Sequence, residues 1–210
     1  MGDWSKYAQI LIALFLLADP LGAIPVFLVL TSEQGREERK RTAALAAGTV
    51  AVVLIPFAFV GVPLLQIFGV RLASFRVGGG VLILIMAISM MFAPPAPLVP
   101  KETLEAAGKH DLAIVPLGVP LIAGPGVVSS VILYADEAKN VYERVFLVVA
   151  IVLLAASVWA ALRLAQPISK LLGRNGINLT VRLMGLLLAA IGVEFICRGL
   201  GELLPGLAGR

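Results

Sequence analysis

One acidic residue, Asp19, lies deep inside the first apolar stretch of this 210-residue chain, directly before a proline. An ionisable side chain at that depth in a hydrocarbon environment is costly, so it is a functional candidate by default. Its carboxylate can receive an ammonium group or carry a proton. It can equally cap a half-helix that restarts at Pro20. The two roles are compatible, and the sequence leaves both open.

Two segments, residues 19–25 and 119–125, carry prolines five positions apart with glycine and alanine close by. They read DPLGAIP and VPLIAGP, agree at four of seven positions, and are offset by 100 residues. Because proline lacks an N–H and clashes with the carbonyl four residues back, both helices are predicted to break here. Freed backbone groups are costly in lipid, so both breaks should turn inward, toward each other.

Helix ends created inside a membrane can bind a ligand. Their N-terminal N–H groups suit a carboxylate, and freed carbonyls can accept from an ammonium group or a cation. Paired Gly/Pro-interrupted segments are the best sequence indication of a transporter site, although two purely structural kinks are the alternative. The predicted substrate-binding residues are Asp19, Pro20, Gly22, Ala23, Pro25, Pro120, Ala123, Gly124, Pro125 and Gly126.

A second acidic residue within an apolar stretch, Glu194, has Arg198 one helical turn away. A structural ion pair is the simpler interpretation, and a proton-relay role stays open, so Asp19 and Glu194 are the candidates for proton coupling. Hydroxyl groups follow both breaks and can contact a polar solute or bond back to their own helix: Thr31, Ser32, Ser129 and Ser130.

The elements that must position these residues are membrane-spanning helices. Hydrophobic residues make up 60% of the chain and charged residues 14%, against about 25% charged in a soluble domain. Six stretches are long enough to cross a bilayer, at residues 7–30, 43–67, 72–92, 112–134, 145–162 and 177–203. The predicted fold is therefore all-α and integral to the membrane, with the first and fourth helices broken near mid-membrane.

The third and sixth stretches also resemble each other, in RVGGGVL from Arg76 and RLMGLLL from Arg182. The chain is therefore predicted to be two three-helix repeats, residues 1–92 and 112–210, joined by a proline-rich linker at 93–111. An odd number of spans per repeat forces the second repeat to be inverted. Small residues that allow close helix approach are expected to pack against the broken helices: Gly78, Gly79, Gly80 and Gly185.

Loop charge predicts the orientation. Nine Lys and Arg residues lie in the first, third and fifth loops, against five at the N-terminus and in the second and fourth loops. This bias places both termini outside the cytoplasmic membrane. The net charge of +4 is explained by the basic residues of these loops, so nucleic acid is not expected as a partner. The single His110 and Cys197, the latter expected to be packed, suffice for no metal site, cofactor or catalytic cluster, so an enzyme is disfavoured.

With these motifs in hand, the sequence resembles the MarC family of bacterial and archaeal membrane proteins. The motifs are residues 19–25, 76–80, 120–126 and 182–187, and the resemblance covers nearly the whole chain. It implies six spans, a kinship to LysE-type amino-acid exporters, and transport of small neutral amino acids such as glycine and alanine. It also implies an amide more often than a carboxylate at Glu194.

The sequence therefore predicts a secondary transporter whose partners are the lipid bilayer, a small amino acid, and H⁺ or Na⁺ as the coupling ion. A non-transporting structural or partner-binding protein and a passive channel are the alternatives. A homo-oligomer is compatible with the sequence, which singles out no interface.

Overall fold

The computed structural model describes residues 4–92 and 122–204, and this part of the chain is helical. Its helices are α1 (Trp4–Ala18), α2 (Ala23–Leu30), α3 (Arg36–Ile67), α4 (Leu72–Phe92), α6 (Pro125–Glu137), α7 (Val141–Arg163) and α8 (Ala165–Leu203). The predicted linker at 93–111, Pro120 and the first part of the fourth predicted span lie outside the described residues. The all-α class is confirmed for the described part.

The lengths of the helices suit a membrane. Helices α3, α4, α7 and the 175–203 part of α8 are long and apolar enough to cross one, and α1 with α2 passes the same test as one broken span. These elements correspond to five of the six predicted spans. The remaining span, 112–134, is described only from residue 122, so six spans and the inverted repeat stay predictions.

One predicted boundary was wrong. Residues 36–42 were expected in a polar connection, but α3 already begins at Arg36. Gly35 precedes it in an extended conformation, and Glu37 and Glu38 occupy the first turn, where negative charge is favoured by the helix dipole. A charged segment therefore extends the apolar span by about two helical turns.

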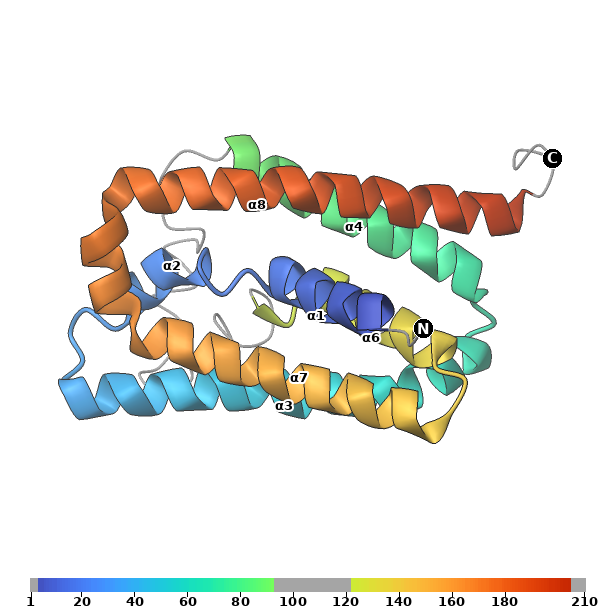
Figure 1. The fold of residues 1–210 in the computed structure, drawn as a ribbon, viewed down its shortest axis with the longest axis horizontal. Coiled ribbons are helices and arrows are strands. Elements are labelled where there is room, and N and C mark those ends of the chain that lie inside the picture. The colour runs from blue at the N-terminus through green and yellow to red at the C-terminus, as the bar shows by residue number, and fades with distance from the viewer. Residues whose placement is uncertain (1–3, 93–121, 205–210) are drawn as a thin grey trace.

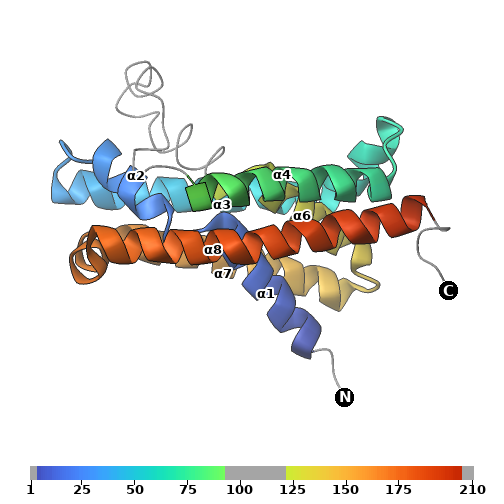
Figure 2. The same cartoon turned by 90° about the horizontal axis from the view of Figure 1, so that it is seen from above.

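The helices form an elongated bundle of antiparallel neighbours. In Figure 1, α3 and α7 lie along one side, α4 and α8 along the other, and α1, α2 and α6 lie between them. Seen from above, α1 tilts away from the bundle toward its N-terminus (Figure 2). We call the end of the bundle where α8 ends, at the right of Figure 1, the terminal end.

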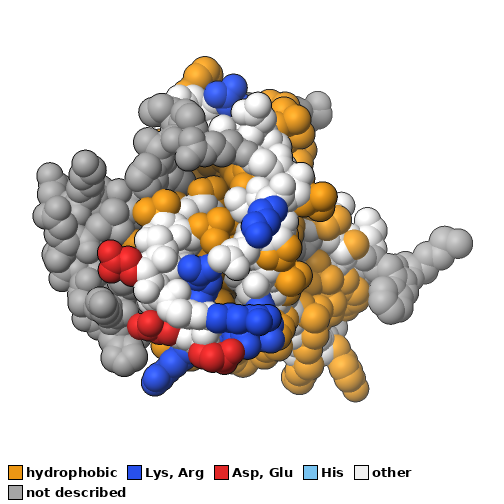
Figure 3. All heavy atoms as spheres, turned by 90° about the vertical axis from the view of Figure 1, so that its left-hand side faces the viewer, with side chains coloured by type: hydrophobic (Ala, Val, Ile, Leu, Met, Phe, Trp, Pro, Cys, Tyr) orange, Lys and Arg blue, Asp and Glu red, His pale blue; other side chains and the backbone are white. Residues whose placement is uncertain are grey.

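The opposite end is named the basic end, because Lys and Arg side chains of α3, α7 and α8 gather there. Figure 3 shows blue and red side chains gathered on this end, beside apolar flanks. The basic residues described there are Arg36, Arg39, Lys40, Arg41, Arg163 and Lys170. At this end α8 bends at Gly173, whose φ of 62° favours glycine. The sixth predicted span therefore forms the longer part of a helix that begins earlier, at Ala165.

Small residues at seven-residue spacing bring α4 and α8 into backbone contact. A methyl group added to Gly192 would lie 2.9 Å from the Gly80 carbonyl oxygen, and one added to Gly199 would lie 2.8 Å from the Ala73 oxygen. The facing pairs are Ala73 with Gly199, Gly80 with Gly192, and Ala87 with Gly185. The close approach predicted for Gly80 and Gly185 thus occurs, but between α4 and α8 rather than against the broken helices.

Candidate functional site

The first break lies at residues 19–22, between α1 and α2, which are bent by 43°. The Asp19 N–H still donates to the Phe15 carbonyl at 3.1 Å, so Asp19 closes the last turn of α1. Its φ of 39° is left-handed, a conformation that Asp tolerates better than most residues. The chain then turns, and helix resumes at Ala23, three residues later than the predicted restart at Pro20.

Asp19 holds this turn through its side chain. The Gly22 N–H donates to Asp19 Oδ1 at 3.1 Å. The same carboxylate lies directly over the Gly22 Cα: an added Cβ would overlap Oδ2 and lie 2.7 Å from Cγ. The capping role is thus observed, and it explains why glycine occupies position 22. Only one hydrogen bond to this carboxylate is formed by the described residues, although a carboxylate can accept about four.

The second break precedes α6. Gly124 is extended, Pro125 occupies the first turn of the helix, and no side chain among the described residues caps this end. Proline suits that position because its missing N–H has no helical partner there. Ile122, Ala123 and Gly124 are buried, so the segment that leads into this helix lies inside the protein, although Pro125 itself is exposed. A helix therefore starts at Pro125, within the segment where a break was predicted.

The two breaks lie beside each other. A Cβ on Gly126 would lie 3.8 Å from Leu17 Cδ2, and these residues are each two positions from a break. Asp19 is 9% exposed, and Pro20 and Ala23 are buried as well. Both breaks therefore face protein, as backbone groups in a membrane require. Pro25 and Pro125 point the other way and are exposed.

Two of the four hydroxyl groups near the breaks bond back to their own helix, which is one of the two expected roles. Thr31 Oγ1 donates to the Phe27 carbonyl at 2.7 Å and Ser130 Oγ to the Gly126 carbonyl at 2.9 Å, so both bond back to their own helix. Ser32 is exposed. Ser129 is 3% exposed and faces α4.

The absence of a side chain at Gly79 makes room for Ser129 against α4. A Cβ added to Gly79 would lie 2.8 Å from Ser129 Cβ, closer than real Cβ atoms approach a neighbour. This contact is the one predicted between the third helix and a broken helix. Gly78 differs, because a side chain there would meet open space. Within the glycine run, Gly79 thus allows close contact with α6, and Gly80 allows close contact with α8.

An ion-pair cluster around a buried arginine at the terminal end was not predicted from the sequence. Arg76, 8% exposed, donates to Glu137 Oε1 at 3.0 Å and to Glu202 Oε1 at 2.6 Å. It thereby links α4 to the C-terminal residue of α6 and to the end of α8. Arg76 was interpreted as a residue at a helix end and counted with loop charges. Two features of the sequence could have indicated the cluster. Arg76 lies in the second turn of an apolar helix, and acidic residues lie at the ends of two other helices.

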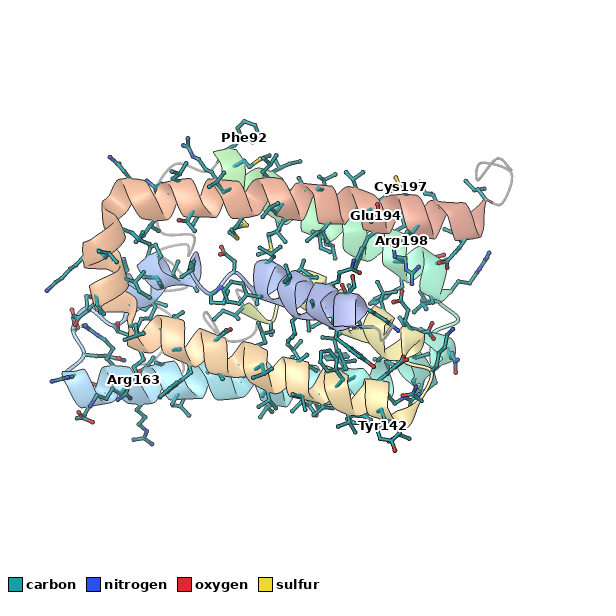
Figure 4. All side chains as sticks on the ribbon, in the orientation of Figure 1. Phe92, Tyr142, Arg163, Glu194, Cys197 and Arg198 are labelled. Carbon is teal, nitrogen blue, oxygen red and sulfur yellow. The ribbon has the colours of Figure 1, made fainter. Side chains whose placement is uncertain are left out.

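Glu194 forms the predicted ion pair with Arg198, at 2.6 Å between Oε1 and Nε. Both side chains are more than half exposed, and Figure 4 places them with Cys197 along α8. Cys197 was expected to be packed, but it is exposed, because it lies on the outer face of α8. Among the residues described, no group of three His, Cys, Asp or Glu side chains is arranged to hold a metal ion.

These features define a class: a multi-pass α-helical membrane protein with a broken helix lying against a second helix that starts inside the bundle. The chain belongs to the MarC family of integral membrane proteins, whose match covers residues 4–204.

Relatives of nearly equal length come from bacteria and archaea. The UPF0056 membrane protein YhcE of Escherichia coli (strain K12) is 38% identical over 98% of this chain and 96% of its own. The UPF0056 membrane protein BU267 of Buchnera aphidicola has the same identity and coverage. An archaeal relative, MJ1677 of Methanocaldococcus jannaschii, is 32% identical over 90% of this chain and 92% of its own. No solved structure matches the chain.

Proposed function

We propose that this protein is a secondary transporter of small neutral amino acids such as glycine and alanine. The observation that carries the proposal is the meeting of two helix breaks in the protein interior, one with a buried carboxylate and one with an uncapped helix N-terminus. These are the two groups that a zwitterion requires. In this reading the ammonium group binds near Asp19, and the carboxylate binds the first N–H groups of α6.

The surroundings of the breaks favour a small side chain. Leu17 lies against Gly126, and Ile122 and Ala123, which directly precede the second break, are almost fully buried. A substrate that fits between such neighbours has room for a hydrogen or a methyl group rather than a branched chain. Among the predicted site residues, the inward-facing ones are therefore the contacts we propose: Asp19, Pro20, Gly22, Ala23, Ala123, Gly124 and Gly126.

The cycle we propose is a rocking of the predicted repeats against each other, with both termini outside the cytoplasmic membrane. The basic end of the bundle would then face the cytoplasm, in agreement with the positive-inside rule. Coupling would be to an ion gradient, most simply of protons, with Na⁺ as the alternative. Asp19 is the better proton carrier of the two candidates, because Glu194 is exposed and already paired.

Asp19→Asn gives a sharp test because asparagine has the same size as aspartate and removes only the charge and the proton-carrying group. It tolerates a positive φ, and its Oδ1 can still accept the Gly22 N–H. Proteoliposomes of the wild-type protein should take up labelled glycine or alanine in a saturable manner. Asp19→Asn should lose most of this uptake, whereas Glu194→Gln, the matched control, should retain it. Normal uptake by Asp19→Asn would remove Asp19 from the mechanism, and non-saturating flux would indicate a channel.

A further inference from the structure

We propose that Arg76, Glu137 and Glu202 form a latch that closes the proposed substrate site toward the terminal end and separates when that side opens. This inference rests on the proposed function, since a latch matters only if a solute passes the breaks. The observation behind it is that one buried guanidinium on α4 pairs with carboxylates from two other helices. The distances are 3.0 Å to the α6 carboxylate and 2.6 Å to the α8 carboxylate.

The latch sits at the far end of the helix that begins at the second break. From Pro125 to Glu137 is 12 residues, or about 18 Å along a helix. That is a little over half of a hydrocarbon core of about 30 Å. With Glu137 near the membrane surface, the break falls near the midplane. The latch and the proposed site thus lie at opposite ends of α6.

Helices α4 and α6 are in contact along the length of α6. Gly126 lies on Ile83, Ser129 lies on Gly79, and Glu137 pairs with Arg76. No hydrogen bond or ion pair is formed in the first two contacts among the described residues, so they hold the helices together by close packing. The ion pair is the strong, directional contact at the end. Its loss therefore frees the end of α6 while leaving the contacts near the break in place.

The arrangement is one-sided. In the predicted repeat, Arg182 corresponds to Arg76, yet Arg182 is exposed and forms no salt bridge within the described residues. Within the described residues, the terminal end therefore has a buried arginine that pairs with two other helices, whereas Arg182 pairs with none. A transporter that alternates between two faces needs such a difference, because both faces must not be closed equally in every state.

The charges of the latch also suit a reversible contact. One guanidinium is shared between two carboxylates, and each is more exposed than the arginine, at 37% and 50% against 10% for the side chains. Water can therefore replace either glutamate as the helices part. The arginine stays with α4, and the glutamates leave with the ends of α6 and α8.

The experiment measures access to Ser129, which is buried between the break and the latch. Ser129→Cys is introduced with Cys197→Ala, because Cys197 is exposed and would itself react. The probe is a membrane-impermeant methanethiosulfonate, added to right-side-out and to inside-out vesicles. Arg76→Gln should raise the labelling rate from the terminal side by about tenfold or more, which is the effect of about 1.4 kcal/mol on an opening equilibrium. Arg76→Lys should raise it less.

Arg198→Gln is the matched control, since it removes an equally charged residue whose partner lies on its own helix. Glu137→Gln should increase labelling from the same side, and the double variant with Arg76→Gln should add little. A rate unchanged by Arg76→Gln, or raised equally from both sides, would overturn the latch. Because the measurement uses no substrate, a failed uptake assay with one-sided labelling would reject the proposed function and leave the latch standing.

Discussion

Gly22→Ala tests whether the Asp19 carboxylate holds the first break in its observed geometry. The new methyl group would overlap Oδ2 and lie 2.7 Å from Cγ, so the carboxylate has to leave. It then loses the hydrogen bond from the residue 22 N–H, and a charge-assisted hydrogen bond contributes about 1.5–3 kcal/mol. We expect Gly22→Ala to lower the free energy of unfolding by about 2 kcal/mol, measured by reversible denaturation in mixed micelles.

The same reasoning predicts strong coupling between the two residues. Asp19→Gly accepts the positive φ of 39° and removes the carboxylate. In that background Gly22→Ala should therefore be nearly neutral. Gly78→Ala is the control, because its methyl group meets open space within a helix and should stabilise by about 0.5–1 kcal/mol. An equal cost of Gly22→Ala with and without the carboxylate, or an effect like that of Gly78→Ala, would show that Asp19 does not hold the break.

Three further variants test other parts of the fold by the same unfolding measurement. Gly192→Ala places a methyl group 2.9 Å from an α4 carbonyl, so it should destabilise by about 1–3 kcal/mol, whereas Gly201→Ala has open space and should not. Gly173→Ala forces a φ of 62° on a residue with a Cβ and should cost about 1–2 kcal/mol; a neutral result would contradict the bend. Arg198→Gln removes an exposed pair with Glu194 and should change stability by no more than about 0.5 kcal/mol; a larger loss would show a hidden role.

The sequence predicted the helices and the breaks because both follow from local chemistry. Apolar length sets the spans, and α4 coincides with its predicted range of 72–92. Proline and glycine mark the breaks, and Asp19 was singled out as a buried charge. The restart of helix at Ala23 was missed, because the turn is set by a side-chain hydrogen bond to Gly22 that no spacing rule specifies.

The sequence could not predict which helix each glycine faces. Gly79 and Gly80 are neighbours, yet one contacts α6 and the other α8, because adjacent residues point about 100° apart on a helix. The pairing of Arg76 with Glu137 and Glu202 joins residues 61 and 126 positions apart. Such contacts depend on the packing of whole helices, and each residue alone looks like an ordinary helix-end charge.

Equilibrium binding of labelled glycine to the purified protein tests the central claim most directly. The claim is that the two breaks form one site for a small zwitterion. We predict saturable binding that alanine displaces and leucine does not, that Asp19→Asn weakens at least about tenfold, and that Glu194→Gln leaves unchanged. Absence of saturable binding, or equal binding to wild type and Asp19→Asn, would contradict the account.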